Sequence, residues 1–299
     1  MELYRDFKPV LLIVNPVSGK KTVLKYLSDI SRTLMVGGYA PTILVTGKRG
    51  DAAEFAAKYG RDFELICCTG GDGTLNETIT GLAREKIHVP VGYIPCGSTN
   101  DFAASHGLAT EITAAVLNIA SAKRTAYDIG LFGEKYFTYV AAFGAFSWLS
   151  YTTDQNLKNL LGHTAYVLDG IKDVPKIKPV HMKLTVDGTV YEDDYIFGAI
   201  CNSVSVAGTI ELPRGEVDTC DGIFEVLLIR EPKSILDLES IVRALLTQDY
   251  TSPFIDFFHA SDIIIETPSE EEWSLDGESS GPFEIAQIHP LPGFLELQG

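Results

Sequence analysis

Basic residues are scarce in this sequence. Its 299 residues include 24 Lys and Arg against 40 Asp and Glu, which gives a formal net charge of -16. Proteins that bind nucleic acids obtain most of their affinity from basic contacts to phosphates. We therefore expect no nucleic-acid partner.

The sequence also lacks a long hydrophobic run. Its longest uncharged stretch, residues 136–153, is interrupted by Thr138, Gly144 and Ser147, whereas a spanning helix needs about 20 predominantly apolar residues. The first apolar run, residues 9–14, is too short and too late for a secretory signal. We expect a cytoplasmic protein.

Cysteine is infrequent and forms no recognisable pattern. The five cysteines are an odd number without metal-ligand spacing, and Cys67 and Cys68 lie in an apolar, strand-like run. This usage favours reduced thiols over a disulfide framework or a zinc site. There is no G-x-G-x-x-G, which argues against a dinucleotide-binding fold, and Gly19-Lys20 lacks the rest of a P-loop.

The first 130 residues or so alternate strand-like and helical patterns, which predicts βαβ units and a mostly parallel sheet. The expected strands are 10–14, 42–45, 65–68 and 89–94, and the expected helices are 20–35, 51–59, 74–84 and 100–106.

The second half has a different pattern. Residues 182–186 alternate in polarity before Asp187-Gly188, and two further Asp-Gly pairs, at 221–222 and 276–277, lie beside strand-like runs. Asp-Gly between such runs predicts β-hairpins. We expect an all-β sandwich with helical stretches near 157–173 and 235–246.

Three loops follow predicted strands and precede predicted helices. They are residues 15–20, 70–77 and 95–101, each containing glycine and asparagine. Glycine lets the backbone approach a phosphate closely, and a helix N-terminus offers free N–H groups. A lone loop of this kind could be an ordinary turn, but three on one sheet edge favour phosphate binding.

The three motifs, Asn-Pro-x-Ser-Gly, Gly-Gly-Asp-Gly-Thr and Pro-x-Gly-Ser-x-Asn-Asp, resemble the diacylglycerol kinase catalytic-domain family in order and spacing. The chain is most similar to its soluble bacterial lipid kinases, and the likeness covers nearly the whole chain. Thr46 with Gly50-Asp51-Ala52, Asp128-Ile129-Gly130 and Asp276-Gly277-Glu278 fit further motifs of the family.

The resemblance implies a phosphofructokinase- or NAD kinase-like α/β domain over residues 1–128, joined by a returning strand near 290–299, and a β-sandwich over 129–289. It implies ATP-dependent phosphorylation of a lipid hydroxyl, with diacylglycerol as the best candidate substrate, and Glu278 and Asp72 as catalytic residues. The implied ATP-binding residues are Asn15, Pro16, Ser18, Gly19, Thr46, Gly70, Gly71, Asp72, Gly73, Thr74, Asn76, Glu77, Gly97, Ser98 and Asn100.

Two magnesium sites are also implied by the resemblance. Asp72, Asp101 and Asp128 would surround a catalytic Mg²⁺, which prefers oxygen ligands. Asp218, Asp221 and the Ile223 carbonyl would form a structural site, although a plain turn explains these residues nearly as well.

Ala145 and Phe146 depart from the family, because many relatives carry an acidic residue there; this leaves head-group recognition open. A kinase of a soluble acceptor such as NAD, or an ATP-binding regulatory protein without turnover, stays an alternative.

A lipid substrate requires peripheral contact with a membrane. The cationic stretch of Lys172, Lys176, Lys178 and Lys183, with Leu160, Leu161, Tyr166 and Leu168 just upstream, is the candidate surface. A homodimer is a further expectation.

Overall fold

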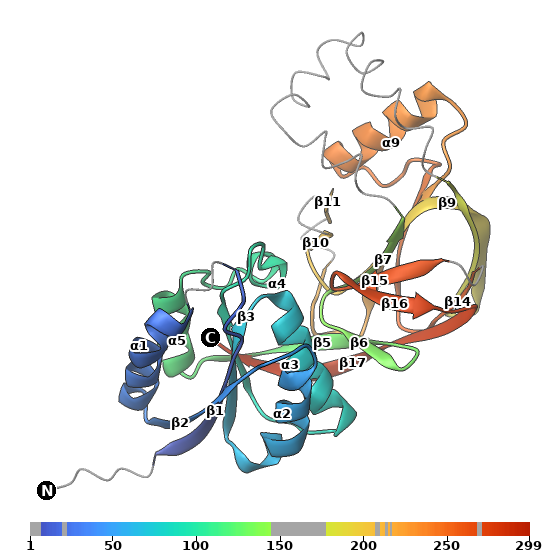
Figure 1. The fold of residues 1–299 in the computed structure, drawn as a ribbon. Helices are drawn as coiled ribbons and strands as arrows, with labels where there is room; N and C mark the ends of the chain where they lie inside the picture. Colours follow the sequence, from blue (N-terminus) through green and yellow to red (C-terminus); the bar gives the residue numbers. More distant parts are fainter. Residues whose placement is uncertain are drawn as a thin grey trace, which may run out of the picture. The chain divides into compact units, whose positions relative to one another are not determined.

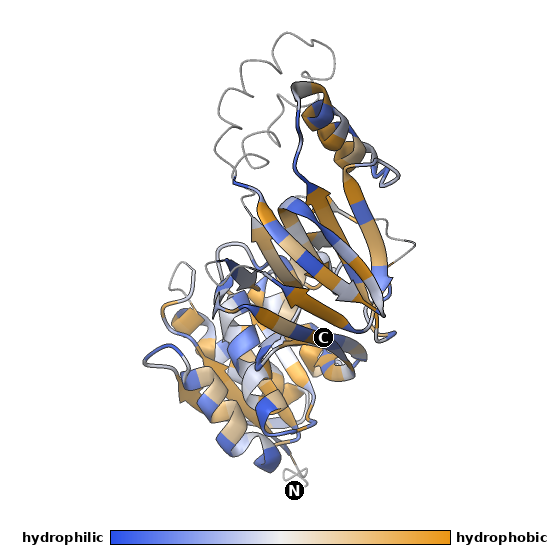
Figure 2. Ribbon diagram, turned by 90° about the vertical axis from the view of Figure 1, so that its right-hand side faces the viewer, coloured by the Kyte–Doolittle hydropathy of each residue, from blue (hydrophilic) through white to orange (hydrophobic). Residues whose placement is uncertain are grey.

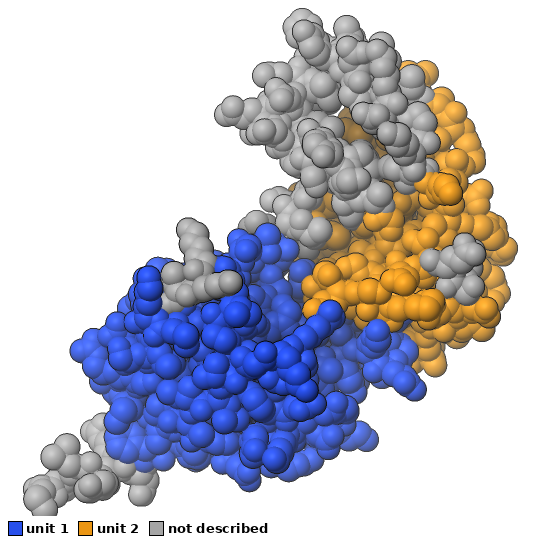
Figure 3. Space-filling model, viewed as in Figure 1, with its two compact units in different colours: residues 1–139, 219–222, 291–299 blue, residues 140–218, 223–290 orange. Residues whose placement is uncertain are grey.

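The computed structural model describes residues 7–19, 23–144, 178–206, 210–212, 215, 217–267 and 271–299. These residues form two compact units, coloured separately in Figure 3. The first unit comprises residues 1–139, 219–222 and 291–299, and the second comprises 140–218 and 223–290. The chain therefore leaves the first unit after residue 139 and re-enters it at 219–222 and at 291–299. The sequence predicts a boundary near residue 128 and a single return near 290–299.

The first unit contains a mainly parallel sheet. Its strands lie in the order β2, β1, β3, β4, β17, β5 and β6, and the first four, together with the end of β17, run parallel. The strands are β1 (Lys8–Val14), β2 (Tyr39–Val45), β3 (Leu65–Gly70), β4 (Val91–Pro95), β5 (Arg124–Phe132), β6 (Lys135–Phe137) and β17 (Ile285–Gln298).

Helices cover both faces of this sheet (Figure 1). They are α1 (Val23–Val36), α2 (Asp51–Tyr59), α3 (Asp72–Arg84), α4 (Asp101–Ser105) and α5 (Ile112–Ala120), with a 3-10 turn at Gly60–Asp62. Alternate residues of a strand point to opposite faces. Val10, Leu12 and Val14 of β1 accordingly pack in one cluster with buried residues of α1 and α5.

The expected βαβ pattern is confirmed. The predicted helix over 51–59 has the observed bounds of α2, and each predicted strand overlaps an observed one. Helix α5 is absent from the sequence-based prediction, although Ile112, Val116 and Ile119 have helical spacing and Glu111 caps the helix by accepting the Ala114 N–H.

The second unit is built from antiparallel strands. They are β7 (Val140–Gly144), β8 (Val180–Val186), β9 (Thr189–Cys201), β10 (Ser205–Val206), β11 (Ile210–Glu211), β12 (Phe224–Arg230), β13 (Ile255–Ala260), β14 (Ile263–Glu266), β15 (Glu272–Leu275), β16 (Glu278–Pro282) and the start of β17. β9 connects several of these strands, because it pairs with β7, β8 and β12. Figure 2 shows how hydrophobic and hydrophilic residues alternate along several of these strands.

Two predicted hairpins are confirmed and one is wrong. Asp187-Gly188 joins β8 to β9, and Asp276-Gly277 joins β15 to β16. Asp221-Gly222 precedes β12 but is no hairpin turn, because β12 pairs with β9 and β13. Helix α9 (Ile235–Thr247) confirms the predicted helix over 235–246, and the predicted helix over 157–173 lies outside the described residues.

Candidate nucleotide site

Three loops follow the carboxyl ends of adjacent parallel strands in the first unit. Loop A (Asn15–Gly19) follows β1, loop B (Gly70–Thr74) follows β3 and loop C (Cys96–Asn100) follows β4. In open α/β sheets, ligands bind outside the carboxyl ends of the strands. The fold therefore brings the three predicted phosphate-binding motifs to one sheet edge.

Glycines allow these loops to lie against one another. A methyl group on Gly97 would lie 2.6 Å from Cα of Gly71, and one on Gly19 would lie 2.1 Å from the carbonyl oxygen of Cys96. Gly19 also has a φ of +50°, which side-chain-bearing residues rarely adopt. Loops A and B thus each contact loop C, and the contacts require glycine.

Side-chain hydrogen bonds fix loops A and C. The Asn15 amide donates to Thr74 Oγ1 at 2.9 Å, while its Oδ1 accepts the Val17 N–H at 3.1 Å. In loop C, Asn100 Oδ1 accepts the Gly97 N–H at 2.8 Å. Asn100 has a φ of +54°, a conformation that asparagine tolerates better than most residues.

Helix α3 begins within loop B. Gly71 precedes its first residue, Asp72, and Thr74 is buried in its first turn. A helix N-terminus carries unsatisfied N–H groups and the positive end of the helix dipole, both of which favour a phosphate. Ser18 is half-buried and Ser98 is exposed, so both predicted hydroxyl donors are accessible.

Asp72 connects loop B to α4. Its carboxylate accepts the N–H groups of Asp101 at 2.9 Å and Phe102 at 3.1 Å, and the Tyr93 hydroxyl lies 3.5 Å away. Burial raises the pKa of Asp101, and the neighbouring charge of Asp72 raises it further. The two carboxylates are therefore close enough for the charge of Asp72 to disfavour ionisation of Asp101.

A fourth segment, which follows β2, is hydrogen-bonded to α3. The Thr46 N–H donates to the Val14 carbonyl, and Glu77 Oε1 accepts the Gly50 N–H at 2.9 Å. The backbone N–H groups of Gly47 and Lys48 bind Asp51 and lower its pKa. Glu77, predicted to hold ATP, here positions the loop after Thr46.

Asn76 has a different neighbour from the rest of the predicted set. Its side-chain amide donates to the Tyr136 carbonyl in β6 at 3.2 Å, and its oxygen accepts from Thr80. Asn76 therefore braces α3 against β6.

A cluster of aromatic side chains, which the sequence does not predict, lies beside loop C. The His106 ring stacks on Phe102 at 4.2 Å and meets Tyr127 edge-on at 4.7 Å, while Phe102 meets Tyr93 edge-on. Burial lowers the pKa of His106 and raises that of Tyr93. Nothing in the local sequence pattern indicates this packing, because Tyr127 belongs to β5.

The predicted magnesium triad is not assembled. Within the described ranges, no three His, Cys, Asp or Glu side chains are placed to hold a metal. Asp72 and Asp101 are neighbours, and these two oxygen donors suit Mg²⁺. Both oxygens of Asp128 accept backbone N–H bonds of 2.6 Å, and this residue is fully buried, whereas Asp72 is only half-buried. Asp128 therefore offers no exposed oxygen and does not fit a metal-ligand role.

The second predicted metal site stays a prediction. Asp218 and Ile223 belong to the second unit, whereas Asp221 belongs to the first. Both aspartates are exposed.

Glu278, the predicted base, is the first residue of β16 in the second unit. Asp276 and Gly277 have φ values of +50° and +89°, as a tight hairpin turn requires. Buried Asp276 accepts the Val140 N–H at 3.0 Å and donates its own N–H to the Val140 carbonyl. The turn that carries half-buried Glu278 is thereby fixed to β7.

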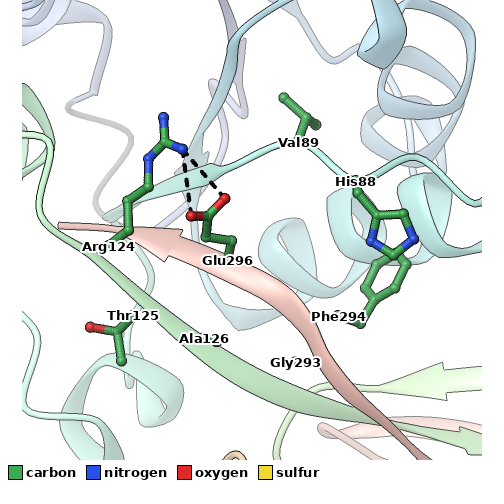
Figure 4. Close-up of a pocket in the computed structure, with 8 residues that line it drawn as sticks. All are labelled: His88, Val89, Arg124, Thr125, Ala126, Gly293, Phe294 and Glu296. Carbon is green, nitrogen blue, oxygen red and sulfur yellow. Dashed lines mark hydrogen bonds and ion pairs between the residues drawn. The ribbon is translucent and has the colours of Figure 1, made fainter.

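A separate pocket lies in the first unit (Figure 4). It has a volume of about 420 Å³ and lies beside His88 and Val89, which precede β4, whereas the loops follow the other end of that strand. His88 packs on Phe294 at 4.9 Å, and Arg124 pairs with Glu296 at 3.5 Å.

The predicted membrane-contact surface lies mostly outside the described residues. Of its cations, Lys178 and Lys183 are described, and Lys183 in β8 pairs with Glu266 at 2.5 Å. No helix among the described segments is long and apolar enough to cross a bilayer.

Comparisons with known proteins agree with this geometry. The family described as "Diacylglycerol kinase catalytic domain" matches residues 9–132, and "YegS C-terminal NAD kinase beta sandwich-like domain" matches residues 146–298. A diacylglycerol kinase of Staphylococcus haemolyticus is 32% identical over 90% of this chain and 82% of its own.

This chain belongs to the diacylglycerol kinase family.

Another diacylglycerol kinase, from Bacillus subtilis, is 29% identical over 94% of each chain. A crystal structure of a diacylglycerol kinase from Bacillus anthracis str. Sterne superimposes with a TM-score of 0.76, at 26% identity over 99% of this chain and 98% of that one. The predicted fold, an α/β domain followed by a sandwich-like β domain, is that of the diacylglycerol kinase family.

Proposed function

We propose that this chain is an ATP-dependent kinase that phosphorylates a lipid hydroxyl, with diacylglycerol as the substrate. The observation that carries the proposal is the contact among loops A, B and C, which gathers glycine backbone and the α3 N-terminus at one edge. Its support from relatives is that diacylglycerol kinases match nearly the full length of the chain.

The first unit would bind and orient ATP. Backbone N–H groups of loop B and the side chains of Asn15, Ser18 and Ser98 would contact the phosphates. Asp72 and Asp101 would hold Mg²⁺, which neutralises phosphate charge. Such transfer depends mainly on positioning and electrostatic stabilisation.

The second unit would supply the base. The lipid hydroxyl oxygen bonds to the γ-phosphorus while the bond from that phosphorus to the bridging oxygen breaks, which releases ADP. Glu278 accepts the hydroxyl proton, the role of a general base. The products are a phosphorylated lipid and ADP.

The test is transfer of label from γ-labelled ATP, with Mg²⁺, to dioleoylglycerol in mixed micelles. Wild-type protein should label the lipid, and Glu278→Gln should lose at least about a hundredfold in kcat, the usual size of a general-base contribution. The matched control is Glu284→Gln, an equally conservative change at an exposed residue of the same unit, which should retain activity.

The alternatives give different results. Labelling of NAD, with none of lipid, would establish the soluble-acceptor kinase. ATP binding without turnover on any acceptor, unaffected by Glu278→Gln, would indicate a regulatory protein.

We also propose peripheral membrane contact through the lysine stretch from Lys172 to Lys183. Anionic lipids attract local basic segments even where the net charge is negative. Charge reversal of Lys172 and Lys176 should weaken co-sedimentation with anionic vesicles, and unchanged binding would reject this surface.

A further inference from the structure

A four-residue segment of the first unit is preceded and followed along the chain by residues of the second unit. Residues 219–222 belong to the first unit, while 218 and 223 belong to the second; the last nine residues, 291–299, also return to the first unit. Four residues cannot bury a hydrophobic core of their own. Specific bonds must therefore hold this segment in place.

Asp128 of β5 supplies bonds to both returning segments. Its N–H donates to the Thr219 carbonyl at 2.8 Å, and its Oδ2 accepts the Gly222 N–H at 2.6 Å. Its other oxygen, Oδ1, accepts the Gly293 N–H at 2.6 Å. The side chain is 0% exposed, so water does not compete for these bonds.

The backbone at both donors is shaped for this contact. Gly222 and Gly293 have φ values of +76° and +60°, where a side chain would be strained. A methyl group on Gly222 would lie 3.1 Å from Pro292, so the two returning segments also touch each other. Figure 4 shows β5 and β17 side by side, with Ala126 and Gly293 on neighbouring strands.

We propose that Asp128 is a positioning residue that anchors residues 219–222 and 291–299 in the first unit, and is not a ligand of a catalytic metal. Charge-assisted bonds from backbone N–H groups are stronger than neutral ones, and a buried carboxylate needs such partners. The anchor accounts for the burial of this carboxylate without a cation. It does not depend on the proposed kinase activity.

Amide hydrogen exchange of Asp128→Asn tests the anchor. Asparagine keeps one acceptor oxygen and turns an NH₂ group toward the other donor, so Gly222 or Gly293 must lose its partner. We expect exchange to accelerate about a hundredfold or more at one of these amides, with little change in β3. No acceleration at either glycine would overturn the proposal.

Mg²⁺ alone, followed by amide chemical shifts, separates the anchor from a ligand role. Asp101→Asn is the matched control, because it makes the same change at a carboxylate that fits Mg²⁺. Read at the amides of Asp72 and Asp101, Asp128→Asn should bind Mg²⁺ within about threefold of wild type, whereas Asp101→Asn should bind it more weakly. A tenfold or greater loss at these same amides in Asp128→Asn would reassign the residue to the metal.

A wild-type measurement keeps the test decisive if Asp128→Asn fails to fold. Both glycine amides of the wild-type protein should be protected to an extent comparable with the buried strand β3. Exchange at the rate of an open loop would overturn the proposal. Failure of the lipid-labelling assay would leave these results unchanged, so the two proposals fail separately.

Discussion

The side-chain amide of Asn15 donates a hydrogen bond of 2.9 Å to Thr74 Oγ1, across 59 positions of sequence. It joins the loop after β1 to the first turn of α3. Thr74 is buried and Asn15 is half-buried, so this bond fixes the side chain of Asn15 next to the loops at which we place the phosphates.

Asn15→Ala should weaken ATP binding. It removes this bond and the acceptor for the Val17 N–H, and an ordinary hydrogen bond contributes about 0.5–1.5 kcal/mol. We expect the KM for ATP to rise by up to about tenfold, with a smaller change in kcat. The control is Asn118→Ala, the same change at an exposed residue of α5. Equal KM values in the two variants would contradict the role of Asn15.

Gly97→Ala should disrupt the loops more severely. The added methyl group would lie 2.6 Å from Gly71 Cα and 2.7 Å from Asn100 Oδ1. The first of these atoms is backbone, which cannot rotate away as a flexible side chain can. Overpacking of this kind costs about 1–3 kcal/mol. A lower Tm and loss of most ATP-dependent activity are expected.

Gly299→Ala is the control for that experiment, because the nearest atom to its added methyl group is at 3.8 Å, an ordinary contact. A Gly97→Ala protein with wild-type Tm and KM would show that loops B and C do not pack as described.

The sequence predicts loops A, B and C well, because the patterns that indicate them lie within short stretches of the chain. Each loop follows a short apolar strand and opens a helix, and residues 51–59 carry their helical pattern within nine positions. The role of Asp128 is different. Its donors, Gly222 and Gly293, are 94 and 165 positions away, so no local pattern reveals that its oxygens are already occupied.

The Asp221-Gly222 pair shows the same limit. Asp-Gly favours left-handed backbone in any tight turn, and Gly222 does have a positive φ. The pair cannot report which strands flank it. Its conformation is used to direct an N–H toward Asp128 and not to close a hairpin.

His106 should make the protein less stable in mild acid. Burial lowers its pKa below the ordinary 6.5, the carbonyl of Phe102 opposes this only in part, and Nε2 is buried without a partner among the described residues. The unfolded chain therefore binds the proton more readily than the folded one. The stability present above about pH 6.5 is lost as the pH falls toward the lowered pKa.

His106→Phe tests this dependence, because phenylalanine retains an aromatic ring to stack on Phe102 but does not titrate. Urea midpoints of wild type should fall between pH 7 and pH 5 by more than those of the variant. Parallel curves would mean that His106 takes up its proton as easily in the folded protein.

His181 should have the opposite pH dependence. Its ring nitrogens lie 3.0 Å from Asp194 and 3.4 Å from Glu192, and these hydrogen bonds raise its pKa above 6.5. The folded protein therefore binds the proton more tightly than the unfolded chain. The stabilisation is complete below about pH 6.5 and is lost as the pH rises through the raised value. Because the three side chains are exposed, the effect on stability should be small and should weaken with added salt.

Titration of the imidazole signals by NMR should give His181 a pKa above 6.5, and the value should fall toward 6.5 in Asp194→Asn. Asp262→Asn, an equivalent change beside a different histidine, should leave it unaltered. A His181 titration that is insensitive to Asp194→Asn would show that the β8–β9 hairpin does not hold this pair together.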